Sequence, residues 1–404
     1  MKRILIFSLT YYPDVVSGAE VAIKEITDRI SPEEIEFDMV TLRFDSALPK
    51  FERIGNVNVY RIGFTLPSPD INALNKFPLT LNKYLFPFIG FLKARALHKQ
   101  NPYTSIWAMM ANYAGFGALF FKMYKPDVEY LLTLQEGDPV EYIKNRVRFV
   151  YPLFKLIFTR ANFVQTISNY LAGFAREMGY GGPLEVVPNG VDILRFGVSY
   201  ETEDLFSLKQ TLGKQPGDVF LVTTSRLVKK NGVDDVIRAL PLLPSQIKFL
   251  VFGQGSDEPQ LRALADTLKV SDRVKFLGQI SHDEMPKYFK ISDIFIRPSR
   301  SEGLGNSFLE AMLCGIPIIG TPVGGIPDFL FDPYKNADKE PTGVFAQVNN
   351  PESIAKQVKL LMEDKSLCAR LVANAKKLVL EKYDWNLIAK NIKEKVFDKL
   401  TSSR

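Results

Sequence analysis

The sequence contains little of what metal centres and disulfide-stabilised proteins need. Its 404 residues include 2 cysteines and 2 histidines. Cys314 and Cys368 do not have the spacing of a metal-binding pair, and His98 and His282 have no partner at ligand spacing. We therefore expect free thiols in a reducing compartment and no metal site.

Long apolar runs and biased segments are also missing. No stretch approaches the roughly 18 apolar residues of a membrane-spanning helix, and the apolar core of the opening MKRILIFSLT is too short for a signal peptide. The net charge of +6 is modest, and no basic run forms a recognisable nucleic-acid-binding module. These absences favour a cytoplasmic globular protein that binds no nucleic acid.

What the chain does contain is an alternation of apolar runs and helix-like segments in both halves. This pattern predicts an α/β fold with two parallel sheets and right-handed crossovers, and 404 residues are enough for two separate cores. We place one domain at 1–192, a second at 193–383, and a terminal helix at 384–404. The runs predicted as strands are 4–9, 37–42, 57–62, 105–109, 129–134 and 163–167, then 219–224, 247–252, 274–277, 294–296 and 316–319.

The segment 294–328 is the most informative part of the sequence. A short strand runs into a glycine turn and a helix begins directly after it, which is an arrangement that binds anions through backbone N–H groups and the helix dipole. Glu302 precedes the turn and Glu310 lies in the helix. Two carboxylates beside a phosphate site suit a ligand with hydroxyls next to its phosphates, as in a nucleotide sugar.

Glu302 and Glu310, with seven residues between them, match the E-x7-E motif of retaining glycosyltransferases. The segment resembles glycosyltransferase family 4, formerly called group 1. The family has the GT-B fold, in which two doubly wound Rossmann-like domains face a cleft and the terminal helix packs onto the first domain. The match spans nearly all of the chain. The other segments that resemble the family are VPNGVD at 187–192, SRLV at 225–228, FGQG at 252–255 and the glycine loop at 12–20.

The resemblance implies a role for each part of the 294–328 segment. Glu302 contacts the donor sugar and Glu310 accepts hydrogen bonds from the ribose hydroxyls. The backbone amides of Leu304, Gly305 and Asn306 hold the phosphates. Capping of the following helix is the alternative role for Glu302, because acidic residues favour the first turn of a helix.

The family places two cations against the leaving diphosphate, in the pattern R-L-x-x-x-K-G. Here the sequence is RLVKKNG at 226–232, so Arg226 fits the pattern. The usual lysine position holds Asn231, and Lys230 lies one residue earlier. We assign the second cation to Lys230, with Lys229 as its competitor and a solvated basic turn as the alternative.

Three further assignments follow from the resemblance. Gly18 lets the first loop approach the diphosphate, with a plain tight turn as the alternative, and Gly253 belongs to the pocket for the nucleotide base. Gln135 stands where the family often has a histidine, and glutamine cannot take up a proton. Glu136 and Asp138 remain candidates for proton transfer or for a structural role in the loop.

Two segments of the first half combine basic and aromatic residues. Residues 71–100 contain five lysines and arginines and no acid, and 144–160 has a similar composition. Such segments lie on anionic membranes in some proteins. They are equally compatible with amphipathic helices packed on a sheet with solvated lysines, and the sequence leaves both open.

The sequence thus predicts a retaining, metal-independent glycosyltransferase with no cofactor. Its donor would be a UDP- or GDP-sugar and its acceptor a glycan or a lipid-linked acceptor, in polysaccharide or envelope glycoconjugate synthesis. The expected location is the cytoplasm, with peripheral contact at the inner face of the cell membrane. The alternative is a non-catalytic nucleotide-sugar-binding protein of an envelope-assembly complex, favoured by Gln135 and Asn231. An NAD-dependent oxidoreductase is disfavoured because the first loop lacks G-x-G-x-x-G, and an epimerase by the E-x7-E and PNGVD segments.

Overall fold

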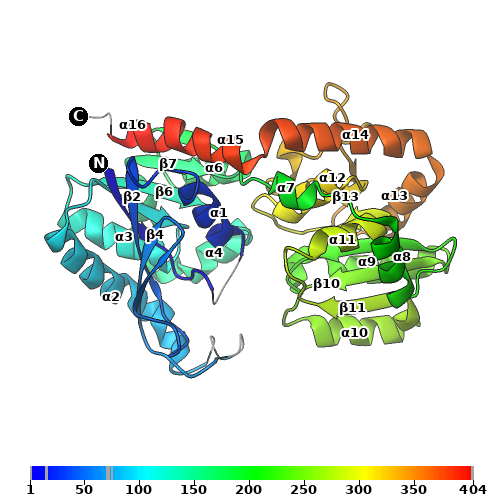
Figure 1. Cartoon of the computed structure of the whole chain (residues 1–404), viewed down its shortest axis with the longest axis horizontal. Helices are drawn as coiled ribbons and strands as arrows, with labels where there is room; N and C mark the ends of the chain where they lie inside the picture. Colours follow the sequence, from blue (N-terminus) through cyan, green and yellow to red (C-terminus); the bar gives the residue numbers. More distant parts are fainter. Residues whose placement is uncertain (1, 14–16, 70–72, 74–75, 402–404) are drawn as a thin grey trace. The chain divides into compact units, whose positions relative to one another are not determined.

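The computed structural model describes residues 2–13, 17–69, 73 and 76–401. The chain divides into two compact units, Met1–Asn189 with Trp385–Arg404, and Gly190–Asp384 (Figure 1). Each unit contains one β-sheet surrounded by helices and has its own buried apolar core. Within the described residues, no helix is both long and apolar enough to cross a bilayer.

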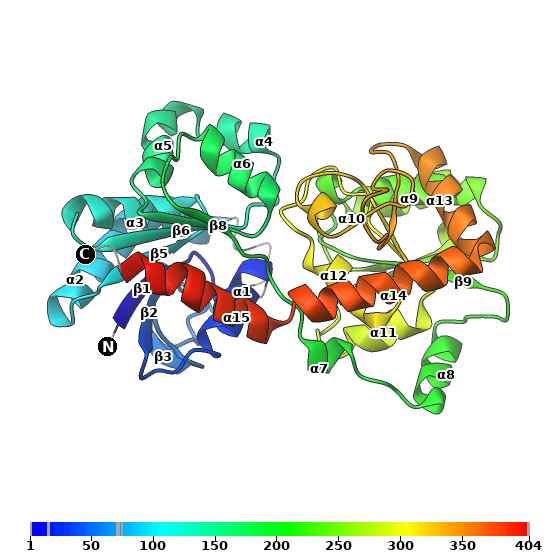
Figure 2. The same cartoon turned by 90° about the horizontal axis from the view of Figure 1, so that it is seen from above.

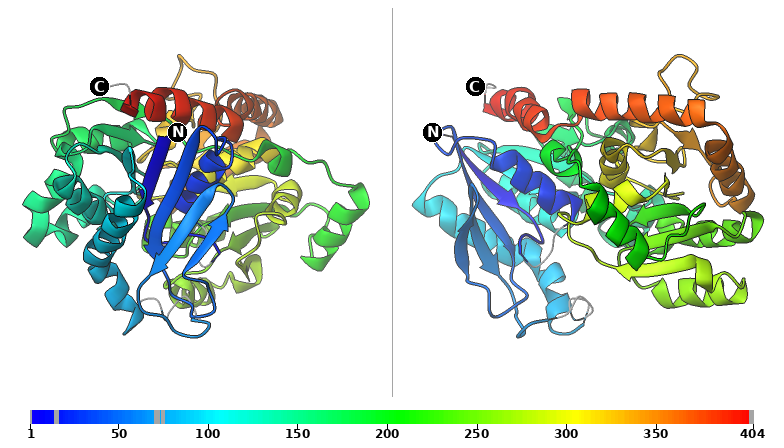
Figure 3. Two further views of the ribbon diagram at one scale, coloured as in Figure 1. Left: turned by 60° about the vertical axis from the view of Figure 1, so that its left-hand side comes forward. Right: turned by 45° about the vertical axis from the view of Figure 1, so that its right-hand side comes forward.

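The sheet of the first unit has eight strands in the order β3-β4-β2-β1-β5-β6-β7-β8. All neighbours are parallel except β3, which forms an antiparallel hairpin with β4 at the edge of the sheet (Figure 3). The direction of chain progression reverses between β1 and β5, which makes the sheet doubly wound. The strands are β1 (Lys2–Phe7), β2 (Ile35–Leu42), β3 (Phe51–Ile54), β4 (Val57–Ile62), β5 (Ser105–Met109), β6 (Glu129–Leu134), β7 (Phe163–Thr166) and β8 (Leu184–Val186).

Helices cover this sheet, and the last of them come from the end of the chain. Helix α15 packs against α1 (Figure 2), and the ring of Phe397 lies 5.3 Å from Trp107 and 5.8 Å from Phe37, centroid to centroid. The tail thereby completes the apolar core of the first unit. The helices of the unit are α1 (Gly18–Thr27), α2 (Leu79–Gln100), α3 (Tyr113–Tyr124), α4 (Val140–Arg146), α5 (Tyr151–Thr159), α6 (Asn169–Glu177), α15 (Trp385–Ile392), the π-helical turn Lys393–Phe397 and α16 (Asp398–Thr401).

The sheet of the second unit has six parallel strands in the order β11-β10-β9-β12-β13-β14. Chain progression reverses between the neighbours β9 and β12. Ligands of such sheets bind beyond the carboxyl ends of the strands at this reversal. The strands are β9 (Val219–Thr224), β10 (Ile247–Phe252), β11 (Val274–Gly278), β12 (Ile294–Ile296), β13 (Ile318–Gly320) and β14 (Val344–Phe345).

The helices of the second unit form two layers. Helix α9 packs against α10 and α13, and α12 packs against α11, α14 and the short α7. The second layer holds the helix that carries Glu310. The helices are α7 (Ile193–Phe196), α8 (Thr202–Thr211), α9 (Val233–Ala239), α10 (Glu258–Thr267), α11 (Met285–Ile291), α12 (Asn306–Cys314), α13 (Pro351–Glu363) and α14 (Lys365–Lys382).

Most strands were predictable because buried parallel strands are short continuous apolar runs. The predicted ranges 57–62, 105–109, 129–134, 219–224, 247–252 and 294–296 coincide with strands of the structure. Strands β3, β8 and β14 were missed, because β3 is an exposed edge strand and the other two have three and two residues. The predicted strand 316–319 is shifted to Ile318–Gly320.

Replacing Gly253 with alanine is expected to destabilise the second unit by about 2–6 kcal/mol. Gly253 has a φ of +123°, and a Cβ there would lie 1.9 Å from the carbonyl oxygen of Ser225. The strained backbone contributes about 1–3 kcal/mol, and the overlap, which pushes apart the loops after β9 and β10, adds about 1–3 kcal/mol. Urea unfolding measures the change.

Gly213 is the matched control for this substitution. It also has a positive φ, +67°, but a Cβ there meets no heavy atom within 4 Å among the described residues. Gly213→Ala should therefore cost only the backbone strain, about 1 kcal/mol. Equal losses for the two variants would contradict the role assigned to the contact between the loops.

Candidate active site

The loops that follow β9 and β12 lie side by side at the carboxyl edge of the second sheet, because these two strands are neighbours. The first loop carries Arg226 and Lys230, and the second carries Glu302. Helix α12 begins directly after the second loop and carries Glu310 in its second turn. The structure thus brings four of the predicted site residues to the place where a doubly wound sheet binds its ligand.

Backbone contacts hold the two loops together. The backbone N–H of Arg300 donates to the carbonyl of Lys230 at 2.7 Å. Gly232 has a φ of +70°, and a Cβ there would lie 2.1 Å from the carbonyl oxygen of Pro298. Glycine is required at 232 because only it allows this close approach. The position of the cations relative to the second loop is therefore set by backbone packing.

Asn231 has a structural role in the first loop. Its side chain is buried, and its Nδ2 donates to the carbonyl of Arg226 at 2.5 Å. The side chain of Arg226 is exposed, and that of Lys230 is half-buried. The hydrogen bond from the Asn231 amide thus stabilises the loop that carries the two basic residues.

Glu302 forms an ion pair that the sequence did not reveal. Glu302 is 8% exposed, and its Oε2 accepts a hydrogen bond from Nη2 of Arg297 at 2.6 Å. The N-cap position of α12 is held by Gly305 and not by Glu302. Arg297 was not among the predicted site residues, since nothing in its spacing from Glu302 indicates an ion pair.

The N-terminus of α12 has the features of an anion site. Gly305 occupies the N-cap position with a φ of +96°, and as a glycine it has no side chain that could cap the helix. The first turn contains no acidic residue, and the side chain of Leu304 is buried. Since the first N–H groups of a helix lack partners within the helix, the amides of Leu304, Gly305 and Asn306 suit a phosphate.

Glu310 differs from Glu302 in its surroundings. It is partly buried, and among the described residues no donor is hydrogen-bonded to its carboxylate. Burial raises its pKa above the usual range, and the nearby His282, Arg195 and Arg297 act in the opposite direction. A desolvated carboxylate without donors is costly, and a hydroxyl-bearing ligand would supply the missing donors.

The glycines at 253 and 255 serve backbone packing. Leu227 donates its N–H to the carbonyl of Gln254 at 2.9 Å, and a Cβ on Gly255 would lie 2.2 Å from the carbonyl oxygen of Leu227. This contact, like the one described for Gly253, explains the G-x-G sequence without a ligand. The assignment of Gly253 to the base pocket stays a prediction.

Gly18 belongs to the first unit, where it is the first residue of α1. Ser17 caps this helix, and the buried Glu20 accepts a hydrogen bond from the Ser17 N–H at 2.9 Å and another from the Thr10 hydroxyl. Residues 14–16 of the glycine loop lie outside the described residues. The assignment of Gly18 to the diphosphate stays a prediction.

Comparison with known proteins shows which family has this arrangement. Residues 206–378 match the family described as glycosyl transferases group 1. An uncharacterized glycosyltransferase of Methanocaldococcus jannaschii is 26% identical over 96% of this chain and 96% of its own length. The second unit, which contains the matched residues, thus belongs to the group 1 glycosyltransferases.

Two further comparisons describe the relatives of this glycosyltransferase. A GDP-mannose-dependent alpha-(1-6)-phosphatidylinositol monomannoside mannosyltransferase of Mycobacterium tuberculosis is 30% identical over 56% of this chain and 59% of its own length. The structure of sucrose-phosphate synthase from Thermosynechococcus elongatus superposes with a TM-score of 0.83, at 19% identity and full coverage of both chains. The predicted family, enzyme class and GT-B fold class are confirmed. Like its family, the glycosyltransferase uses a nucleotide-sugar donor.

In the first unit, Gln135 and Glu136 directly follow the carboxyl end of β6. Gln135 forms a reciprocal amide pair with Asn189, with N–O distances of 3.2 and 3.1 Å. Glu136 is 6% exposed, and its Oε1 accepts a hydrogen bond from the Ala111 N–H at 2.6 Å, while its Oε2 is buried without a hydrogen-bond partner among the described residues. Burial raises the pKa of Glu136 to about 7. Asp138 adds to this increase.

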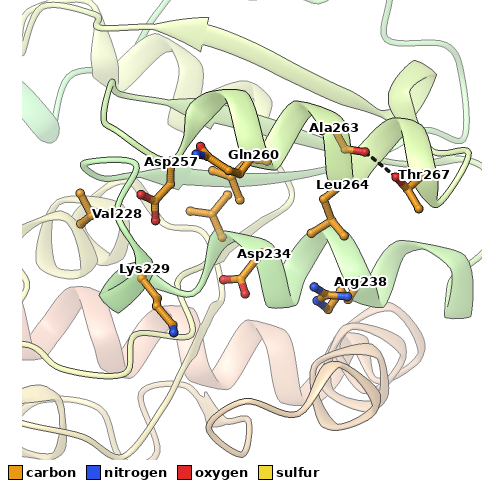
Figure 4. A pocket seen from close by; sticks show the side chains of 11 residues that line it. Val228, Lys229, Asp234, Arg238, Asp257, Gln260, Ala263, Leu264 and Thr267 are labelled. Atoms are coloured by element: carbon orange, nitrogen blue, oxygen red, sulfur yellow. Dashed lines mark hydrogen bonds between the residues drawn. The ribbon is translucent and has the colours of Figure 1, made fainter.

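A surface groove lies between α9 and α10 of the second unit (Figure 4). Its lining includes Val228 and Lys229 from the loop after β9, with Asp234 and Arg238 on α9 and Asp257 before α10. Apart from Lys229, the competitor of Lys230, its lining contains none of the predicted site residues. Within the described residues, no cluster of His, Cys, Asp and Glu has the geometry of a metal site.

Proposed function

We propose that this glycosyltransferase moves a hexose, with retention of anomeric configuration, from a UDP- or GDP-sugar to a glycan or lipid-linked acceptor. The pathway would be the synthesis of a polysaccharide or an envelope glycoconjugate. The observation that carries the proposal is the N-terminus of α12, which has a glycine at its N-cap, together with Glu302 in the preceding loop and the donor-free Glu310 in the helix. A nucleotide sugar has a partner for each of these groups: the sugar for Glu302, the diphosphate for the helix N-terminus and the ribose for Glu310.

Each part of the site has a defined task in the proposed reaction. The amides at 304–306 hold the diphosphate, and Glu310 accepts hydrogen bonds from the ribose hydroxyls. Arg226 and Lys230 offset the negative charge that grows on the leaving phosphate. Charge stabilisation of this kind is the largest electrostatic contribution in many enzymes. Glu302, held by Arg297, orients the sugar.

The chemical step exchanges one bond at the anomeric carbon for another. The bond to the phosphate oxygen breaks, a bond to the acceptor oxygen forms on the same face of the sugar, and the acceptor proton passes to the leaving phosphate. Gln135 cannot take up a proton, which agrees with a route in which the phosphate itself is the base. The amide pair that Gln135 forms with Asn189 suits a role in positioning the loop after β6 and not in proton transfer.

A product assay tests the proposed function. The purified protein is incubated with UDP- and GDP-hexoses and with membrane lipid extracts or oligosaccharides, and the products are examined by NMR. The expected result is stoichiometric release of nucleoside diphosphate and a glycosidic bond with the anomeric configuration of the donor. An inverted product, or no transfer from any donor, would overturn the proposal. Loss of transfer in Glu302→Ala would distinguish the enzyme from a non-catalytic binding protein.

A surface of the first unit supports a lipid-linked acceptor, at the inner face of the cell membrane. Tyr84 and Phe88 are exposed on α2, and the ring of Tyr84 lies 5.5 Å from that of Tyr113. Arg146 at the end of α4 lies near Tyr113, whose hydroxyl contributes to the raised pKa of the guanidinium. Phe149 is 85% exposed. These aromatic side chains, with basic neighbours and no acid on α2, have the composition of a surface that contacts anionic lipid headgroups.

Binding to vesicles is expected to depend on Phe149 and Arg148, whose guanidinium lies 4.5 Å from the centroid of the Phe149 ring. Phe149→Ser with Arg148→Ser should weaken binding to phosphatidylglycerol vesicles about tenfold or more, since an apolar and an electrostatic contact are both lost. Co-sedimentation measures this effect. Tyr334→Ser, which removes an exposed ring of the second unit, is the control. Equal binding to phosphatidylcholine and phosphatidylglycerol, or no effect of the double variant, would contradict the assignment.

A further inference from the structure

Arg297 occupies a central place in the site, and its only assigned role so far is to hold Glu302. It is the first residue after β12, and its side chain is 11% exposed. Nη2 donates to Glu302 at 2.6 Å and to Oδ1 of Asn231 at 3.2 Å, and Nη1 donates to Oγ of Ser307 at 3.0 Å. One guanidinium therefore contacts both loops of the site and the second residue of α12.

The charge balance of the site requires such a cation. Glu302 and Glu310 contribute two carboxylates, and a nucleotide diphosphate adds further negative charge. A nearly buried carboxylate without a counter-charge is strongly unfavourable. Arg297 pairs with Glu302 directly and is near enough to Glu310 to affect its pKa. It offsets the repulsion that the two acids would otherwise exert on the diphosphate.

The contact with Asn231 explains a second feature of the loop. An amide at 231 can accept a hydrogen bond from Arg297, whereas an ammonium group there would lie about 3 Å from a guanidinium of the same sign. A lysine at 231 and an arginine at 297 are therefore mutually unfavourable. The arginine brings positive charge to the place where a lysine at 231 would bring it.

We propose that Arg297 supplies a further positive charge to the donor site, beside Arg226 and Lys230 and in place of a lysine at 231, and that it also positions Glu302. Positive charge reaches the diphosphate from the loop after β12 as well as from the loop after β9. The Nε of Arg297 is buried without a hydrogen-bond partner among the described residues, so part of its donor capacity is still unused. The proposal rests on the proposed function, because it assumes a diphosphate beside α12.

The test compares affinities for nucleoside diphosphates and monophosphates by calorimetry, with UDP against UMP and GDP against GMP. Arg297→Leu should reduce the preference for the diphosphate by about 10- to 100-fold, as expected for the loss of charged hydrogen bonds. Arg297→Lys should lie between this variant and the wild type. A purely structural role would weaken both nucleotides equally and leave the ratio unchanged.

Second-site rescue makes the test specific. Asn231→Lys alone should weaken diphosphate binding, because it places two cations in contact. The same substitution in the Arg297→Leu background should raise the preference for the diphosphate at least tenfold above that of Arg297→Leu alone. If Arg297→Leu fails to fold, the nucleotide preferences of this double variant and of Arg297→Lys still test the proposal. Arg262→Leu is the control, since Arg262 is exposed on α10 and pairs with Glu258 of the same helix.

The outcomes separate this proposal from the proposed function. If the wild type binds no nucleoside diphosphate, the proposed function fails and the role of Arg297 fails with it. If the wild type binds diphosphates and transfers sugar, but folded Arg297→Leu keeps the full preference, only the role of Arg297 is overturned. Absence of rescue by Asn231→Lys in a folded double variant would overturn it as well.

Discussion

Glu302→Gln is expected to lower the kcat of sugar transfer by about 100- to 1,000-fold, the range observed when one charge-stabilising group is removed from an active site. Glutamine keeps the size of the side chain and an acceptor oxygen, but it loses the negative charge that Arg297 now holds in place. The sugar then loses a fixed hydrogen-bond acceptor, and the guanidinium is free to move. Affinity for the nucleoside diphosphate should change much less, because the amides at 304–306 are unaltered.

The stability of this variant must be measured in parallel. Removing one partner of a nearly buried ion pair leaves the other uncompensated, which costs about 3–5 kcal/mol when the pair is fully buried. Initial rates are therefore compared at a temperature where circular dichroism shows both proteins folded. Glu258→Gln, at an exposed ion pair of α10, is the matched control and should retain wild-type rates. A Glu302→Gln variant that is folded and transfers sugar at the wild-type rate would contradict the assigned role.

Glu136→Gln is expected to abolish a pH dependence of stability in the first unit. Burial raises the pKa of Glu136 to about 7, whereas an unfolded glutamate titrates near 4.3. Between these values the folded chain binds more protons than the unfolded chain, so the free energy of unfolding falls as the pH rises. The total loss between the two pKa values is about 4 kcal/mol, at about 1.36 kcal/mol for each unit by which they differ.

Urea unfolding at pH 5 and at pH 8 measures this effect. At pH 5 the wild type and Glu136→Gln should have similar stabilities, since a neutral carboxyl and an amide can both accept from the Ala111 N–H. At pH 8 the variant should be the more stable by about 3 kcal/mol or somewhat less. Glu141→Gln, on an exposed side chain of α4, should keep the wild-type slope. If Glu136→Gln keeps it too, Glu136 is not the group that titrates.

The arrangement of the main chain was largely readable from the sequence. Buried parallel strands are continuous apolar runs, and the glycine turn before α12 marks a helix start with little ambiguity. The edge hairpin β3–β4 was not foreseen, because residues 51–54 alternate between exposed and half-exposed positions. Its pairing depends on a neighbouring strand rather than on its own composition.

The candidate site was predictable only in part, for a related reason. The two glutamates could be found because their spacing is local and belongs to a recognisable motif. The pairing of Arg297 with Asn231 joins residues 66 positions apart, and no local pattern connects them. The same holds for Glu136, whose raised pKa results from the packing of β6 beside the loop after β5. Burial and long-range pairing are properties of the folded chain.

The central claim is that the carboxyl edge of the second sheet binds a nucleotide sugar through α12 and its flanking carboxylates. Calorimetric titration of UDP-, GDP- and ADP-sugars into the wild type and into Glu310→Leu tests it directly. We predict that at least one donor binds the wild type and that Glu310→Leu weakens its binding by about tenfold or more, through the lost ribose hydrogen bonds. Absence of binding at millimolar concentration for every donor, or equal affinities for the two proteins, would contradict the claim.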